Sequence, residues 1–188
     1  MEPKALLSIL HQAEKLKCVT RHCDTTSGRR ESVAEHSWRL ALMAMLLSGE
    51  EEFRDMDMDK VIRMCLIHDL GEAFTGDIPA FEKSSADEKK EDAAYDSWVA
   101  GFPDAQRREF QSLLAEMGAL ETREAKLYKA LDKVEALIQH NESPLSTWLP
   151  LEYELQLTYG TEQMAFSPYM KALRVQVDDW TREKIAKG

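Results

Sequence analysis

The segment from residue 59 to residue 79, DKVIRMCLIHDLGEAFTGDIP, constrains the fold more than any other part of the chain. Its first half is apolar almost all round, because Val61, Ile62 and most of residues 64–67 leave little polar surface. A helix that is apolar on every side is stable when other elements of the protein cover it. The segment therefore predicts a central helix inside a bundle of helices.

Four polar side chains follow at the end of this predicted helix: His68, Asp69, Glu72 and Asp77. Burying a charged group without a partner costs free energy. A divalent metal offsets that cost, because imidazole nitrogen and carboxylate oxygen are both good metal ligands. Glu72 lies four residues after His68, which places both on one helical face, and Gly71 is expected to end the helix. We therefore predict a metal site at this point.

Length and charge limit the class of protein. A chain of 188 residues fits one domain, which we place over residues 1–188 with its core at about 5–175. The net charge of −10 argues against a nucleic-acid polymer or a membrane surface as the main partner, and no apolar run reaches membrane-spanning length. Three cysteines without CxxC spacing favour free thiols in a reducing compartment, so we expect a cytoplasmic protein.

The other segments also have helical patterns, so we predict an all-α fold that forms a single compact bundle. No convincing strand alternation is present, and residues 18–31 are expected to form a loop. Ser32 and Glu35 have the spacing of a capping box, which starts a helix at Ser32 and places His36 in its first turns. Further helices are expected from Pro3 to about Lys17, from Ser84 or Ser85 to about Gly101, from Pro103 to about Met117 with Gly118 as its end, and from about residue 168 onwards.

The helix predicted from Glu121 to about His140 carries one more candidate carboxylate. Its apolar stripe faces the core, and Lys126, Lys129, Lys133 and His140 are expected on the solvent side. Asp132 lies on a third strip among small or uncharged residues. From that strip a single carboxylate can reach into a pocket.

Together these residues resemble a known family. His36, His68-Asp69 and Asp132 match the H…HD…D pattern of the HD-domain metal-dependent phosphohydrolases. The segments RRESVAEH, HDLGE, TGDIP and EAKLYKALDKVE are similar to the 5′-deoxynucleotidase branch of that family. The resemblance covers roughly residues 5–175. It implies a compact helical HD domain, a homodimer, and a phosphatase of nucleotide metabolism that hydrolyses deoxynucleoside 5′-monophosphates with a divalent metal.

The same resemblance implies roles for individual residues. His36, His68, Asp69 and Asp132 correspond to the metal ligands. Glu72 is expected to orient or deprotonate the attacking water. Asp77 is expected to contact the sugar or to assist protonation of the leaving oxygen.

Two points of the ligand set stay open at this stage. Glu72 and Asp77 are alternatively ligands of a second, magnesium-like ion. The identity of the first ion is also open among Mn, Co, Fe, Ni, Zn and Mg, since a mixed nitrogen and oxygen set accepts many divalent metals.

Arg21 lies where an arginine of related proteins orients the phosphate, a role that suits the guanidinium fork. Members of this branch often carry an aromatic residue directly after that arginine, whereas this chain has His22. The departure keeps a different small phosphoester open as the substrate.

Other branches of the family fit the residues less well. No histidine lies between His68 and His140, as HD proteins with two tightly bound metals would need, and Ala73 replaces the second acid of the HDxxED motif found in alarmone hydrolases. A nucleotide-binding HD protein with little catalysis remains a second hypothesis from a different class.

Overall fold

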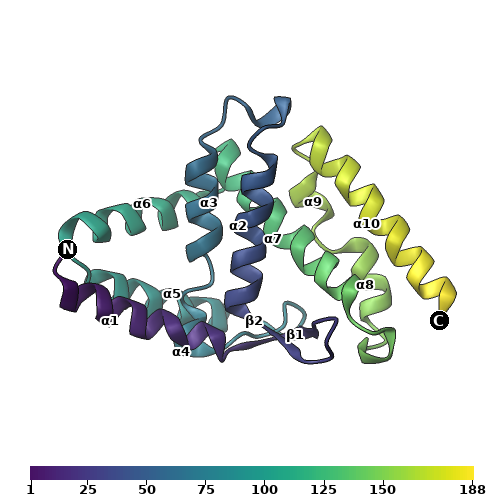
Figure 1. Ribbon diagram of the computed structural model, residues 1–188, viewed down its shortest axis with the longest axis horizontal. Helices are drawn as coiled ribbons and strands as arrows, with labels where there is room; N and C mark the ends of the chain where they lie inside the picture. The colour runs from purple at the N-terminus through teal and green to yellow at the C-terminus, as the bar shows by residue number, and fades with distance from the viewer.

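Three helices form the centre of the molecule. The computed structural model describes residues 1–188, and α2 (Val33–Leu47), α3 (Met58–Ile67) and α7 (Arg123–Glu142) pack against one another in its core (Figure 1). Val61, Met64 and Cys65 of α3 have no solvent exposure, as expected for an apolar helix inside a bundle. The predictions of a central helix and of an all-α fold are confirmed.

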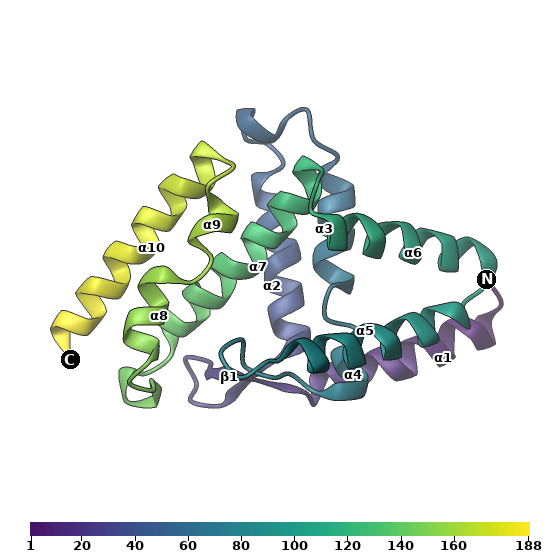
Figure 2. The ribbon, with the colours of Figure 1, turned by 180° about the vertical axis from the view of Figure 1, so that it is seen from behind.

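The remaining helices lie on two sides of this core (Figures 1 and 2). One side holds α1 (Pro3–Ala13) with the 3₁₀ helix η1 (Glu14–Lys17), α4 (Glu72–Thr75), α5 (Ser85–Ala100) and α6 (Asp104–Ala119). The other side holds α8 (Glu152–Thr158), α9 (Thr161–Met164) and α10 (Pro168–Lys187). Two further 3₁₀ turns, η2 (Glu51–Phe53) and η3 (Leu145–Thr147), connect longer helices. None of the helices combines the length and the apolar character needed to cross a membrane.

Side-chain caps fix where the helices begin. The Ser32 hydroxyl accepts a hydrogen bond from the Glu35 backbone N–H, and the Glu35 carboxylate accepts one from the Ser32 backbone N–H. This reciprocal pair is the predicted capping box, and it satisfies two backbone donors that the helix itself leaves free. Ser84, Thr122 and Ser167 cap α5, α7 and α10 in the same position.

A short antiparallel hairpin replaces the predicted loop at residues 18–31. It consists of β1 (Thr20–Asp24) and β2 (Arg30–Ser32). The prediction of a loop over these residues was therefore wrong, because strands of five and three residues are too short to show a clear alternation. Three hydrogen bonds tie the hairpin to the end of α7. Gln139 Nε2 donates to the Asp24 carbonyl at 2.7 Å, and the Ser143 hydroxyl donates to the same carbonyl at 2.8 Å and accepts from the Asp24 N–H at 3.0 Å.

Two glycines predicted as helix ends have other roles. Helix α3 already ends at Ile67, and Gly71 has a right-handed helical φ of −60° just before α4. A Cβ at Gly71 would lie 2.9 Å from Glu91 Cγ, so glycine is needed here for the close approach of α5. Helix α6 continues through Gly118 and ends at Ala119, and the capping residue Leu120 adopts a left-handed φ of 51°.

Candidate metal centre

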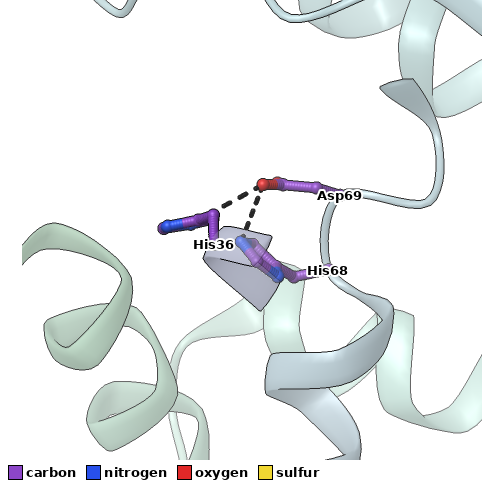
Figure 3. A group of neighbouring side chains, drawn as sticks. All are labelled: His36, His68 and Asp69. Atoms are coloured by element: carbon purple, nitrogen blue, oxygen red, sulfur yellow. Dashed lines mark ion pairs between the residues drawn. The ribbon is translucent and has the colours of Figure 1, made fainter. Parts of the chain in front are cut away.

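The four predicted metal ligands come together from three separate helices. His36 lies in the first turn of α2, His68 and Asp69 follow α3, and Asp132 lies in the middle of α7. The Asp69 Oδ2 atom is 2.9 Å from His68 Nε2 and 3.8 Å from His36 Nε2 (Figure 3). The Asp132 Oδ1 atom is 3.5 Å from His36 Nε2 and 3.8 Å from His68 Nε2. Two imidazoles and two carboxylates therefore face a common point.

The hydrogen bonds of the two imidazoles determine which nitrogen is free. His68 Nδ1 is 2.9 Å from the Cys65 carbonyl oxygen, and His36 Nδ1 bonds a carboxylate oxygen of Glu135. Because each Nδ1 donates a proton to an acceptor, the lone pair of the neutral ring lies on Nε2 in both histidines. Both Nε2 atoms are buried and have no hydrogen-bond partner. Buried polar atoms are normally paired, so two lone pairs opposite two carboxylates fit a bound divalent cation.

The electrostatics of these side chains favour a positive charge between them. Burial and Arg21 act to lower the pKa of His36, but Glu135 and Asp132 outweigh them and raise it to about 9. Burial opposes ionisation of Asp69, yet His68 and His36 hold its pKa below the usual range. A metal ion supplies the positive charge that a proton would otherwise bring to this point.

A buried carboxylate that the sequence reasoning missed orients His36. Glu135 has no solvent exposure and binds His36 Nδ1 through one oxygen, while its other oxygen accepts from Arg39 Nε at 2.6 Å. Arg39 also donates to Glu142 through Nη1 at 2.6 Å. Such outer partners fix the ring orientation of a metal-binding histidine. Glu135 lies one turn after Asp132, and that spacing was the available signal.

Two lysines of α7 face the site rather than solvent. Lys129 Nζ and Lys133 Nζ lie 3.0 and 3.3 Å from the Oδ2 atom of Asp132. Asp132 raises the pKa of Lys129, so that lysine is charged. The prediction that Lys129, Lys133 and His140 lie on the solvent side is wrong, since all three line a cavity beside Asp132 and only Lys126 is exposed. Helix α7 is covered on more faces than one apolar stripe indicates.

Beside the four predicted ligands lies a cavity of about 210 Å³, whose lining includes Arg21, Asp69, Glu72, Asp77 and Asp132. The structure thus brings all the predicted catalytic and substrate-binding residues to one place. Glu72 is 4% exposed, and its Oε2 atom has no hydrogen-bond partner. Burial, together with Asp69 and Asp77, raises the pKa of Glu72 to about 10. Burial and Asp69 likewise raise the pKa of Asp77, although Arg21 opposes them.

Arg21 reaches the site from the unpredicted hairpin. Its Nη1 atom is 3.6 Å from Asp69 Oδ2, and its Nε atom is 3.4 Å from Glu31 Oε2. Glu31, which is 2% exposed and also accepts a hydrogen bond from the Cys23 thiol, was not singled out from the sequence. The β1–β2 pairing is what places Glu31 beside Arg21, and no local pattern predicts that contact. Arg29 and Arg30 are exposed, as expected.

Comparison with known proteins identifies the family to which this chain belongs. The profile of the HD domain family matches residues 13–174. A solved structure described as a predicted metal-dependent phosphohydrolase from Magnetospirillum magnetotacticum superimposes with a TM-score of 0.81 at 30% identity, covering 98% of this chain and 93% of that one. The chain therefore belongs to the HD-domain family.

Curated relatives specify the branch to which the chain is similar. The 5′-deoxynucleotidase HDDC2 of Xenopus laevis is 35% identical over 140 residues, which is 72% of this chain and 68% of the relative. The human protein of the same name is 31% identical over 143 residues, or 74% of this chain and 68% of the relative. The cyanophage S-2L HD phosphohydrolase, solved with dA and one catalytic Zn²⁺, shares the fold with a TM-score of 0.59 at 20% identity, covering 95% of this chain and 96% of that one.

Proposed function

We propose that this protein hydrolyses deoxynucleoside 5′-monophosphates to a deoxynucleoside and phosphate, in a reaction that depends on a divalent metal. The observation that carries the proposal is the pair of unpartnered imidazole nitrogens of His36 and His68 opposite Asp69 and Asp132, beside a cavity. The similarity to 5′-deoxynucleotidases over most of the chain supports the choice of substrate.

His36, His68, Asp69 and Asp132 would hold the metal through Nε2 and carboxylate oxygens. A divalent ion bound there supplies Lewis-acid polarisation of a phosphate oxygen and lowers the pKa of a water. The two-nitrogen, two-oxygen donor set suits Mn, Co, Fe, Ni or Zn, and Mg to a lesser degree, so availability would decide among them.

Glu72 would orient the attacking water and accept its proton. Burial, Asp69 and Asp77 raise its pKa and Arg21 opposes them, so the ionised form of Glu72 requires the positive charge of a bound metal ion. Asp77 would contact the sugar or protonate the leaving oxygen, because its raised pKa favours holding a proton. The alternative is that Glu72 and Asp77 bind a second magnesium ion.

Arg21 would bind the non-bridging oxygens of the phosphate. Its side chain is 15% exposed, and its Nη1 atom lies 3.6 Å from a predicted ligand, Asp69, which supports a contact with the phosphate. Positive charge fixed at the position where negative charge develops lowers the activation barrier.

The decisive experiment is phosphate release from a panel of ribo- and deoxynucleoside 5′- and 3′-monophosphates, with chelated protein resupplied with single metals. We expect release from deoxynucleoside 5′-monophosphates only, and none from Asp69→Ala, which controls for contaminating phosphatase. If the protein binds metal but releases phosphate from none of these nucleotides, a nucleotide-binding role is favoured. Release from a different phosphomonoester would favour the alternative substrate class that His22 keeps open.

We further propose a homodimer in the cytoplasm. The three cysteines are free, which suits a reducing compartment.

The dimer is supported by apolar side chains on the surface of α2. Trp38, Met45 and Leu46 are 55–67% exposed there, and exposed apolar groups of this size are common at interfaces between subunits. Light scattering on the purified protein tests the dimer, and a monomer at micromolar concentration would refute it.

A further inference from the structure

The cavity holds a second cluster of polar side chains besides the predicted metal ligands. The cluster consists of His22 on β1, His140 on α7 and Glu152 at the first residue of α8. His22 Nε2 lies 3.2 Å from Glu152 Oε1, and His140 Nε2 lies 3.6 Å from Glu152 Oε2. None of these residues takes part in the reaction proposed above.

The neighbouring groups hold the cluster in place. The Leu149 N–H donates to Glu152 Oε2 at 2.6 Å, which fixes the carboxylate against the backbone. The His140 ring stacks on Trp148 with a centroid distance of 4.4 Å, and His22 meets the ring of Phe81 edge-on at 5.5 Å. Side chains fixed in this way are suited to binding a ligand without a large entropic cost.

Hydrogen-bonding capacity in the cluster is unused. The Nε2 atoms of His22 and His140 are buried and have no hydrogen-bond partner. Burial lowers the pKa of His140 to about 4, so this ring is neutral at pH 7 and does not neutralise the carboxylate of Glu152. Glu152 is 5% exposed, yet it lines the cavity. The carboxylate of Glu152 already accepts the Leu149 N–H, and its remaining lone pairs have the capacity to accept an N–H donor from a ligand.

We propose that Glu152, flanked by His22 and His140, is a specificity-determining residue that accepts a hydrogen bond from the exocyclic amino group of the substrate base. The inference rests on the proposed function: a nucleotide whose phosphate binds at Arg21 and Asp69 would place its base in the same cavity, which Glu152 also lines. The cavity wall also includes Phe81 and Leu155, which offer apolar surface to the faces of a base.

The chemistry of the bases predicts which substrates can form this hydrogen bond with Glu152. Adenine, cytosine and guanine each carry an exocyclic amino group that can donate to a carboxylate. Thymine carries a carbonyl oxygen in place of this amino group, and its one ring donor, N3–H, lies between two carbonyl oxygens. A carbonyl oxygen placed against the Glu152 carboxylate leaves both groups unsatisfied. A site built to bind a donor rejects an analogue that lacks it, because its own buried group is then unpaired. The protein should therefore prefer the three amino-bearing substrates over dTMP.

The test compares wild-type protein with Glu152→Gln, because glutamine keeps the size and the acceptor for the Leu149 N–H but offers an amide N–H₂ to thymine. We expect kcat/KM for dAMP, dCMP and dGMP relative to dTMP to fall about tenfold in this variant. Glu154→Gln removes the same charge from an exposed position of α8 and should leave these ratios unchanged. Calorimetric binding of free deoxyadenosine and thymidine gives a second readout that needs no turnover.

The outcomes separate this inference from the proposed function. If Glu152→Gln lowers all four rates equally, or leaves the ratios unchanged, Glu152 does not select the base and the inference is wrong. If the wild-type protein releases no phosphate from any deoxynucleotide, the proposed function fails. In that case tighter binding of deoxyadenosine than of thymidine, lost in Glu152→Gln, still supports base selection, and equal or absent binding of both overturns it.

Discussion

The substitution Glu135→Gln tests whether the site is built to bind a metal. Glu135 is fully buried and contacts His36 Nδ1 through one oxygen and Arg39 Nε through the other. Glutamine has nearly the same shape, but it keeps one oxygen acceptor and replaces the other with an N–H₂ donor. One of the two contacts then sets donor against donor, and the negative charge that favours a cation near His36 is lost.

Two estimates of the effect agree. A hydrogen bond to a charged group contributes about 1.5–3 kcal/mol. Loss of an outer partner of a metal-binding histidine typically weakens metal affinity about 10–100-fold, which corresponds to roughly 1.4–2.7 kcal/mol because each tenfold change equals about 1.4 kcal/mol. We therefore expect Glu135→Gln to weaken metal binding by about 2 kcal/mol while the helical fold survives.

The assay is competition for Mn²⁺ or Zn²⁺ against a chromophoric chelator, with circular dichroism as the check on folding. Glu142→Gln is the matched control, because Glu142 also contacts Arg39, at 2.6 Å, but does not touch His36. The control should bind metal within about twofold of wild type. The reasoning would be refuted if folded Glu135→Gln also bound metal within twofold of wild type.

Three further predictions address catalysis and stability. Glu72→Ala should retain metal and substrate binding but lose about 100-fold or more in kcat; loss of the metal instead would make Glu72 a ligand. Gly71→Ala should lower the free energy of unfolding by about 1–3 kcal/mol in urea titrations, because the added Cβ would contact a side chain of α5. Gly49→Ala is the control, since a Cβ at Gly49 has no heavy atom within 4 Å. A hydrogen bond from Arg29 lowers the pKa of Glu35 from 4.5 to about 2. This carboxylate therefore stabilises the fold above pH 4.5, and its contribution is lost as the pH falls towards 2. The free energy of unfolding of Glu35→Gln in urea should depend less on pH between these values, and an unchanged profile would contradict the prediction.

Local rules were enough to predict the parts of the fold whose causes are local. The capping box at Ser32 starts α2, and the apolar run before His68 forms the central helix. Asp132 is different, because its position depends on how α7 packs against α2 and α3. Its predicted place beside His36 came from the family pattern, and the geometry agrees with it.

The parts that could not be predicted depend on contacts between distant residues. Glu31 reaches Arg21 only because two short strands pair, and the hairpin itself is held by Gln139 and Ser143 at the C-terminal end of α7. The spacing of Lys133 predicts a surface position, yet its side chain lines the cavity and contacts Asp132. A one-dimensional pattern does not state which faces of a helix are covered.

The spread of the four predicted ligands along the chain has a thermodynamic consequence. His36 and Asp132 come from helices that meet only in the folded protein, so the unfolded chain offers no comparable binding site. A ligand that binds the native state alone stabilises it by RT ln(1 + [L]/Kd). The melting temperature should therefore rise with metal concentration, and the size of that rise ranks the metals by affinity without any substrate being known.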